Sequence, residues 1–321
     1  MSDIRENAPA PVRRPSRLLA LKLFGIAALA PFAITLCGSL IPDMGPNAEG
    51  LLSNVLYYLP FLVLPVLLCV RRGKMDAESL RPNPLPVSSM FSIVAAALIC
   101  VFLVNDIILL WAIPFQKMGF NLDAFSMHVP TDPMGLSLCI LYAAVLPGVC
   151  EELLFRGAML PAFEQYGTRR ARVITALLFA LLHGNIIGLP TQIMLGLILA
   201  DVVILTDSIY GGMVFHTVYN AALLIIQSIQ TGTAAAEPVG DYFALIGGMG
   251  GVLTMLVSIA ISGLLVHFTL RILRLRARLE GRVPIPGTKR RLSGSEIGVL
   301  AAGLTLVLVR YVLVCRTMLT S

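Results

Sequence analysis

Long apolar segments separated by short polar ones recur along the whole chain of 321 residues. Most are close to the length of about 20 residues that an α-helix needs to cross the hydrocarbon core of a bilayer. The strict alternation of polar and apolar residues that marks a membrane β-barrel is not found. The pattern therefore predicts an all-α fold, a polytopic bundle of transmembrane helices.

Eight spans are expected from this pattern, with polar loops between them. They lie at residues 18–41, 51–70, 87–113, 136–166, 173–187, 190–206, 211–229 and 242–270. A ninth apolar segment at residues 297–314 is interrupted by Arg310, and it is either a further span or a helix at the membrane surface.

The same pattern divides the chain into four parts. We expect a disordered cytoplasmic arm at residues 1–17, an eight-helix membrane domain at 18–270 whose core lies at about 136–229, a basic cytoplasmic segment at 271–295 and a C-terminal apolar helix at 296–321.

Composition supports a membrane protein, since 57% of the residues are hydrophobic and only 13% are charged. A soluble domain has about 25% charged residues. The net charge of +6 could suggest a nucleic-acid partner, but the basic residues fall on alternate sides of the expected spans. The loops after the first, third and seventh expected spans, which would lie on the other side, contain Lys117 as their only basic residue. This arrangement predicts a cytoplasmic N-terminus and no nucleic-acid partner.

The basic segment has two interpretations that the sequence leaves open. Its arginines, from Arg271 to Arg291, can act only as a determinant of membrane topology, or they can also bind anionic lipid headgroups. In either case the lipid bilayer is a partner of the chain.

Three charged residues, Glu151, Glu152 and Arg156, lie inside the fourth expected span. A charge at the bilayer centre costs about 3 kcal/mol on insertion scales, so these residues need a reason to be there. Glu152 and Arg156 are four residues apart and can pair on one helix face. Glu151 points about 100° away, and an unpaired carboxylate in an apolar wall suits a general base. The alternative is a structural ion network that ties helices together.

Two later spans each carry a histidine, His183 and His216. His216 and Asn220 share a helix face and could donate hydrogen bonds to a developing oxyanion. His183 alone could equally be a core residue, and Asn220 could make an interhelical hydrogen bond. Counting residues from the span ends puts Glu151 and His183 at similar depth but His216 nearer the cytoplasm. Helix tilt or a break at Gly211–Gly212 would have to close this gap.

The order and spacing of these residues resemble the CPBP family of intramembrane proteases, also called the Abi family. The resemblance rests on three motifs within residues 151–220: Glu-Glu-x-x-x-Arg (Glu151, Glu152, Arg156), Phe-x-x-x-His (Phe179, His183) and His-x-x-x-Asn (His216, Asn220). The family includes type II CAAX prenyl proteases and bacteriocin-processing or self-immunity proteins. An intermediate glycine motif is half kept, since Gly196 and Leu197 fit but Ile193, Ala200 and Asp207 depart from it.

The resemblance implies a mechanism and a role for each motif. Glu151 and His183 would activate a water molecule, His216 and Asn220 would bind the oxyanion, and Glu152 and Arg156 would hold Glu151 in place. We expect a site without a metal cofactor. The alternative is zinc bound by Glu151, His183 and His216, although no His-Glu-x-x-His helix is present.

Three functions follow as hypotheses. The first is an intramembrane endopeptidase, itself an integral protein of a bacterial inner membrane. It would cleave a membrane-associated protein or peptide, whether or not that substrate carries a lipid. The second is a proton-coupled transporter with Glu151, Glu152 and Asp106 as a relay, although no internal repeat is found. The third is a non-catalytic immunity or scaffold protein on the same fold.

Overall fold

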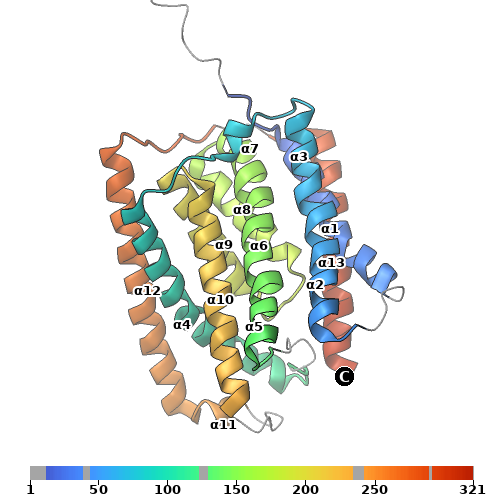
Figure 1. The fold of residues 1–321 in the computed structure, drawn as a ribbon, viewed down its shortest axis with the longest axis vertical. Coiled ribbons are helices and arrows are strands. Elements are labelled where there is room, and N and C mark those ends of the chain that lie inside the picture. Colours follow the sequence, from blue (N-terminus) through green and yellow to red (C-terminus); the bar gives the residue numbers. More distant parts are fainter. Residues whose placement is uncertain (1–11, 39–43, 123–128, 234–241, 289–290, 321) are drawn as a thin grey trace, which may run out of the picture.

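A computed structural model describes residues 12–38, 44–122, 129–233, 242–288 and 291–320, and all regular structure in these ranges is helical (Figure 1). The α-helices are α1 Arg17–Gly38, α2 Pro46–Tyr58, α3 Leu64–Arg71, α4 Val87–Lys117, α5 Pro133–Ile140, α6 Leu146–Glu152, α7 Leu160–Glu164, α8 Thr168–Leu182, α9 Leu189–Thr206, α10 Ile209–Thr233, α11 Tyr242–Leu245, α12 Gly248–Leu279 and α13 Gly294–Thr320. The short helical turns are η1 Leu59–Val63, η2 Ala77–Leu80, η4 Leu141–Val145 and η5 Leu153–Met159.

Within the described residues, 8 helices are long and apolar enough to cross a membrane. The predicted all-α bundle of transmembrane helices is therefore confirmed. The eight candidates include α13, so the ninth apolar segment has the length and composition of a span. They do not include a helix for the expected span at residues 173–187.

The expectation of a full span at 173–187 is wrong because α8 is too short. It has 15 residues, which at about 1.5 Å per residue is roughly 22 Å, less than the hydrocarbon core of about 30 Å. The apolar sequence continues past its end, but Gly184 takes a positive φ of 64° and breaks the helix. Hydropathy alone does not mark such an ending.

The helices α8 and α9 form a hairpin whose two ends lie on one side of the bundle. Arg81, in the segment after η2, makes an ion pair with Glu164 at the end of α7 and another, at 3.1 Å, with Asp207 after α9. Since α8 starts just after Glu164, both arms of the hairpin reach the same end. Its tip, after Leu182, lies inside the molecule and carries His183.

Proline residues explain why the central span is built from several pieces. Residues 133–164 comprise α5, α6 and α7 joined by the π-helical turns η4 and η5. Pro147 has no N–H to donate to the carbonyl of Ala143, one turn earlier, so that carbonyl is free for another partner. That partner is the side-chain amide of Asn220, which donates to it.

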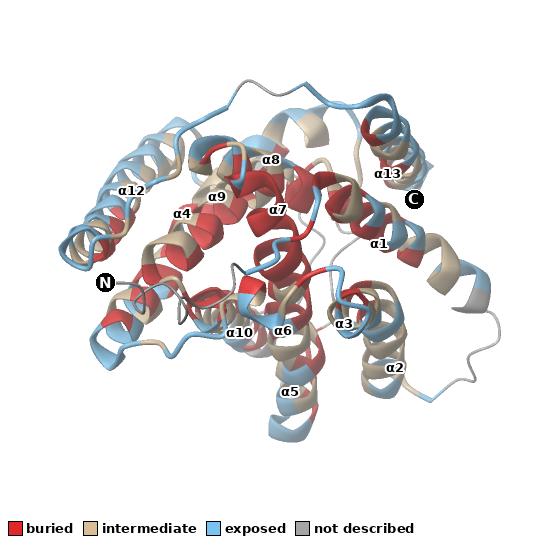
Figure 2. Ribbon diagram, turned by 90° about the horizontal axis from the view of Figure 1, so that it is seen from above, coloured by how far each residue is buried: buried red, intermediate tan, exposed pale blue. Residues whose placement is uncertain are grey.

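This central span is the most buried of the candidate spans. In its most apolar window 56% of the residues are buried, against 11% in both α12 and α13. Figure 2 shows the same contrast, with buried residues on α6 and α7 in the middle and exposed ones on the outer faces of α12 and α13. The charged motif of residues 151–156 therefore lies at the centre of the bundle.

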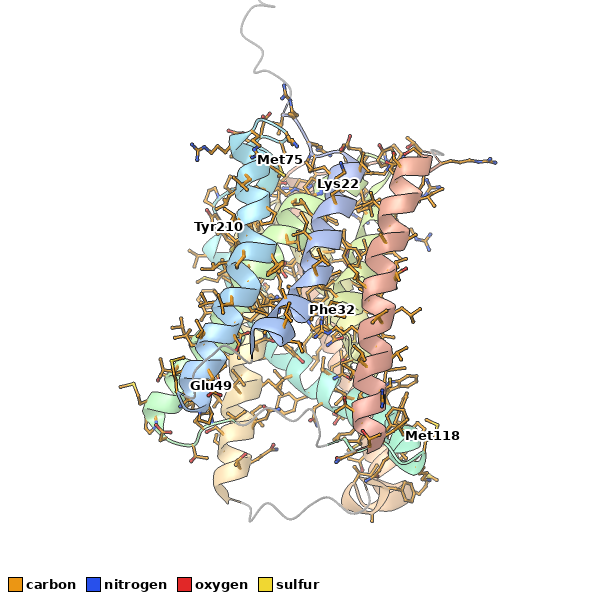
Figure 3. All side chains as sticks on the ribbon, turned by 90° about the vertical axis from the view of Figure 1, so that its right-hand side faces the viewer. Lys22, Phe32, Glu49, Met75, Met118 and Tyr210 are labelled. Atoms are coloured by element: carbon orange, nitrogen blue, oxygen red, sulfur yellow. The ribbon has the colours of Figure 1, made fainter. Side chains whose placement is uncertain are left out.

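Arginine side chains connect the helix ends on one side of the molecule. Arg17 at the start of α1 bonds Glu296 at the start of α13 at 2.9 Å, and Arg276 near the end of α12 bonds Ser89 at the start of α4 at 3.1 Å. We call this side, where α3 ends and α8 begins, the basic end. In Figure 3, Lys22 and Met75 lie toward the basic end, whereas Glu49 and Met118 lie at the opposite end.

The predicted arm at residues 1–17 is only partly described, since residues 1–11 lie outside the described ranges. In the described part, Arg13 and Asp76 exchange hydrogen bonds: the Arg13 N–H donates to the Asp76 carboxylate at 2.6 Å, and the Asp76 N–H donates to the Arg13 carbonyl at 2.9 Å. Gln165 donates to the Pro15 carbonyl at 2.9 Å. These bonds hold the arm, just before α1, to the basic end.

Candidate functional site

Glu152 and Arg156 form the ion pair that their spacing predicts. Arg156 Nη1 lies 2.7 Å from Glu152 Oε1, and both side chains are fully buried. Arg156 Nη2 also donates to the Gly196 carbonyl at 3.1 Å, which links the central span to α9. The half-kept glycine motif thus has a packing role, since a Cβ on Gly196 would lie 2.9 Å from Ala176 Cα of α8.

His216 of α10 joins the same carboxylate. Its Nδ1 lies 3.0 Å from Glu152 Oε1. One turn earlier, Gly212 makes room for this carboxylate, because a Cβ there would lie 2.7 Å from Glu152 Oε2. Glu152 therefore fixes α10 against the central span through one shared oxygen.

The expected gap in depth between His216 and Glu151 is closed by a buried turn rather than by a broken helix. α10 runs without interruption from Ile209. The preceding Ser208 is fully buried, and its hydroxyl donates to the Asn83 carbonyl at 2.6 Å. The Ile209 N–H donates to the backbone carbonyl of Arg81 at 2.9 Å. The segment after η2 packs on this turn, and His216 Nε2 lies 4.0 Å from Glu151 Oε2, so the gap inferred by counting residues is absent.

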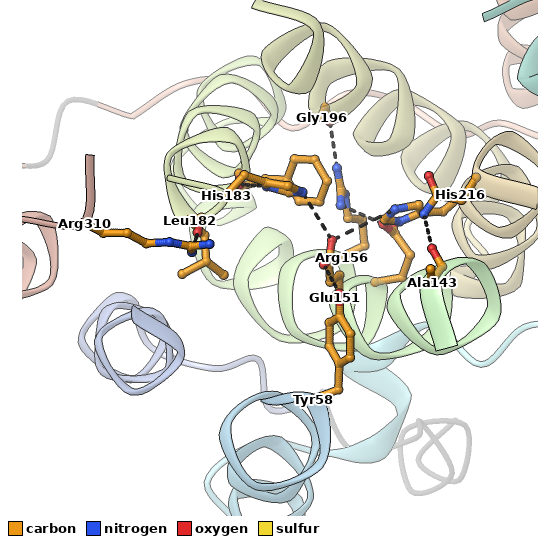
Figure 4. Close-up of polar contacts among 12 residues, drawn as sticks. Tyr58, Ala143, Glu151, Arg156, Leu182, His183, Gly196, His216 and Arg310 are labelled. Carbon is orange, nitrogen blue, oxygen red and sulfur yellow. Dashed lines mark hydrogen bonds and ion pairs between the residues drawn. The ribbon is translucent and has the colours of Figure 1, made fainter. Parts of the chain in front are cut away.

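Glu151 lies at the point where three helical segments meet (Figure 4). Its Oε1 accepts a hydrogen bond of 2.9 Å from the Tyr58 hydroxyl of α2. Its buried Oε2 has no hydrogen-bond partner among the described residues and lies 4.0 Å from Nε2 of both His183 and His216. These separations are too long for direct hydrogen bonds, and one water at about 2.8 Å from each of two such atoms would span them. One oxygen of the carboxylate is thus held by Tyr58, and the other faces the two imidazoles.

Both histidines present Nε2 to Glu151 because their other nitrogen is occupied. His183 Nδ1 lies 2.8 Å from the Phe179 carbonyl, and His216 Nδ1 lies 3.0 Å from the Glu152 carboxylate. Since these oxygens can only accept, Nδ1 carries the proton in each ring. A neutral ring then offers a lone pair at Nε2, and His216 can donate from Nε2 only when the ring is doubly protonated.

Phe179 packs against three of the charged or titratable side chains. Its ring centroid lies 4.7 Å from that of His183 and 6.0 Å from that of His216. The Arg156 guanidinium carbon lies 4.6 Å from the same centroid, a cation–π contact. Phe179 thus holds both imidazoles in place from one side, which explains its position one turn before His183.

A cavity of about 520 Å³ opens in front of Glu151, His183 and His216. Asn220 lines it, and its Nδ2 donates a long hydrogen bond of 3.4 Å to the Ala143 carbonyl that Pro147 leaves free. The wall also carries the polar side chains of Asn105, Gln192 and Gln227 among apolar ones. The cavity has a volume and a mixed polarity that are typical of ligand sites in proteins.

The four proposed catalytic residues therefore line one cavity, while the transporter hypothesis loses a member of its relay. Asp106 does not line the 520 Å³ cavity; its neighbour Asn105 does. Of the two acids that remain, Glu152 is fully buried in its ion pair.

Sequence reasoning missed two residues of the site. Tyr58 is one, since a tyrosine in an apolar run gives no specific signal. The other is Arg310 of α13, which lines a second cavity of about 220 Å³ together with Tyr58, Glu151 and His183. Arg310 Nη1 donates to the Leu182 carbonyl at 2.6 Å, at the end of α8. For Arg310 the sequence does offer a signal, because an arginine inside the apolar segment at residues 297–314 needs a partner.

The distances around Glu151 can be compared with those in a zinc site. Ligand atoms of a tetrahedral zinc site, at about 2.0–2.2 Å from the metal, lie roughly 3.3–3.5 Å from one another. Glu151 Oε2 is 4.0 Å from Nε2 of both His183 and His216. Across the described ranges, no group of three or more His, Cys, Asp or Glu side chains has a metal-binding arrangement.

The comparison with known families points to the same segment. Residues 133–222 match the model of a family described as type II CAAX prenyl endopeptidase Rce1-like. The matched segment contains all six residues of the sequence-based prediction, Glu151, Glu152, Arg156, His183, His216 and Asn220. No curated protein and no solved structure matches the chain.

Proposed function

Because residues 133–222 match the model of a family described as type II CAAX prenyl endopeptidase Rce1-like, we propose that the protein is a glutamate-dependent intramembrane endopeptidase. Its substrate is a membrane-associated protein or peptide, and the reaction is hydrolysis of a peptide bond by a water molecule that Glu151 and His183 activate. The observation that carries the proposal is the unpartnered, buried Oε2 of Glu151, 4.0 Å from two imidazole nitrogens in the wall of a cavity.

The first step forms the new C–O bond. A water molecule between Glu151 Oε2 and the His183 Nε2 lone pair gives up a proton to the carboxylate, and its oxygen attacks the scissile carbonyl carbon. Tyr58 keeps Oε1 in a fixed direction, so that Oε2 faces the water. Holding the reactants in this way lowers the barrier by removing much of the orientational freedom that would otherwise be lost.

The second step collapses the tetrahedral intermediate. Its oxyanion accepts hydrogen bonds from Asn220 Nδ2 and from His216 Nε2, with the His216 ring doubly protonated and stabilised by the Glu152 carboxylate at 3.0 Å. The C–N bond then breaks, and the leaving nitrogen takes the proton that Glu151 received. One water is consumed, and one carboxylate and one amine are formed.

The proposal includes a location. The positive residues at the basic end support a cytoplasmic N-terminus, and we propose a bacterial inner membrane as the location. The hairpin α8–α9 supports access for water, because its short first arm ends at His183, well inside the bundle. The substrate is therefore cleaved at a depth where its anchoring part remains in lipid.

The experiment compares two acid-to-amide variants in membranes. Glu151→Gln removes the base, whereas Asp106→Asn is a matched control in another apolar helix, outside the 520 Å³ cavity. The new termini of membrane proteins are identified by proteomics in cells with wild-type protein and with each variant, and a prenylated peptide with a free C-terminus is tested on the purified proteins.

We expect cleavage products with the wild type and with Asp106→Asn but not with Glu151→Gln, which should remain folded. Full cleavage by Glu151→Gln would refute the assignment of the base. Proton-coupled flux in liposomes without any cleavage would instead select the transporter, and a biological effect that survives Glu151→Gln would select a scaffold role.

A further inference from the structure

A further cavity, separate from the two around Glu151, lies at the basic end; it has a volume of about 340 Å³ and lies between the start of α8, the end of α9 and the end of α12. Five of the residues that line it are arginines, and no lysine is among them: Arg169, Arg172, Arg274, Arg278 and Arg282. Because these residues come from different parts of the chain, the fold gathers the charges in one concave place.

One carboxylate organises the arginines on the floor of this cavity. Asp201 of α9 has a side chain that is only 15% exposed and accepts from Arg172 at 2.9 Å and from Arg274 at 3.3 Å. Arg282 pairs with Glu280 and also donates to the Leu205 carbonyl. Asp201 therefore holds two guanidinium groups in fixed directions but balances only one of their charges.

The remaining two arginines are not balanced by any carboxylate in the described part of the chain. Arg169 and Arg278 have no acidic side chain within the 4.0 Å that defines the ion pairs of this structure, and both are exposed at the rim. Like charges this close repel one another, so the cavity favours an anionic ligand that would relieve the repulsion.

The chemistry of the wall indicates which anion. Guanidinium groups bind phosphate oxygens through pairs of parallel N–H donors, which lysine cannot do. Thr168 and Arg169 begin α8, whose N-terminus carries a partial positive charge. Beside these polar groups the cavity has apolar walls from Ile204, Leu205, Ala277 and Pro284. A ligand with both a phosphate group and an apolar part fits this surface.

The position of the cavity narrows the choice to a lipid. Arg274 and Arg278 lie in the last two turns of α12, a candidate span, so the cavity is at the depth of the headgroups when the bundle is in a bilayer. We propose that this five-arginine cavity binds the phosphate of an anionic phospholipid in the leaflet at the basic end. The proposal does not depend on the protease activity.

Binding is measured on the full chain in neutral detergent by native mass spectrometry, with phosphatidylglycerol, phosphatidylcholine and inorganic phosphate as the probes. The test variant is Arg169→Gln with Arg278→Gln, which leaves the Asp201 cluster intact. The control is Arg71→Gln with Arg72→Gln, exposed residues of the basic end outside the cavity, which changes the net charge equally. Arg278→Lys alone tests whether paired donors matter.

We expect the wild type to prefer phosphatidylglycerol over phosphatidylcholine, and the test variant to lose about tenfold or more of that affinity. The control should lose less than about twofold, and Arg278→Lys should fall in between. Equal losses in the test and control variants would show non-specific attraction and overturn the proposal. Inorganic phosphate that competes at the same concentration as the lipid would overturn the assignment to a lipid.

Discussion

Replacing Gly212 by alanine would place a methyl group against the carboxylate that connects the central span to α10. The new Cβ would lie 2.7 Å from Glu152 Oε2 and 2.8 Å from Val203 Cγ2. Ordinary van der Waals contact begins at 3.4 Å. The carboxylate or α10 must therefore move by about 0.7 Å, the difference between 3.4 and 2.7 Å.

The energetic cost follows from what Glu152 holds. Its Oε1 bonds Arg156 at 2.7 Å and His216 at 3.0 Å, both within a fully buried network. A hydrogen bond to a charged group contributes about 1.5–3 kcal/mol, whereas glycine to alanine inside a helix gains about 1 kcal/mol. If one of the two bonds is lost, Gly212→Ala is destabilised by about 0.5–2 kcal/mol, the loss of the bond less the helix gain. If the lost bond of about 1.5–3 kcal/mol is the one to His216 and its energy acts in the transition state, kcat falls about 10- to 150-fold, since about 1.4 kcal/mol is a factor of ten in rate.

The matched control is Gly263→Ala in α12, where a Cβ meets nothing within 4 Å. Both variants are compared with the wild type by thermal unfolding in detergent, which needs no substrate, and by the initial rate of cleavage of a substrate found by terminal proteomics. We expect Gly263→Ala to match the wild type in both assays. A Gly212→Ala protein as stable and as active as Gly263→Ala would refute the argument that Glu152 positions His216.

Three further predictions concern the groups around Glu151. Tyr58→Phe removes the 2.9 Å donor to the Glu151 carboxylate and should lower kcat about tenfold or more, from a bond of about 1.5–3 kcal/mol; a normal kcat would exclude a role for Tyr58 in holding the base. Arg310→Met removes the donor to Leu182, next to His183, and should lower kcat about fivefold, from a bond of about 1 kcal/mol, with partial recovery in Arg310→Lys. Chelation with 1,10-phenanthroline should leave the rate of cleavage unchanged, and a loss that zinc restores would instead support the zinc alternative.

The residues that could be predicted from the sequence are charged residues inside apolar segments, because an unpaired charge in lipid is energetically costly. The spacing of Glu152 and Arg156 gave their ion pair, which has a distance of 2.7 Å. The three motifs gave the meeting of Glu151 with His183 and His216, both at 4.0 Å. The charges inside apolar helices and their order along the chain therefore carried most of the prediction.

The parts that could not be predicted depend on backbone geometry and on long-range packing. The end of α8 is set by the positive φ of Gly184, while the apolar pattern continues beyond it. The approach of His216 to Glu151, at 4.0 Å, could not be obtained by counting residues from the start of its helix. Tyr58 is 93 residues from the carboxylate that it bonds, and nothing in its own neighbourhood marks it.

The donors to the site from α2 and α13 have a consequence for any attempt to isolate the proposed protease as a smaller unit. A minimal fragment restricted to the family-matched residues 133–222 would retain the acid, the imidazoles and the amide. It would lack the phenol of Tyr58 and the guanidinium of Arg310, which reach the centre from opposite termini of the chain. Such a fragment would keep the proposed reactive groups but lose the two side chains that position them, so we expect the proposed activity to require the whole assembly of helices rather than the matched segment alone.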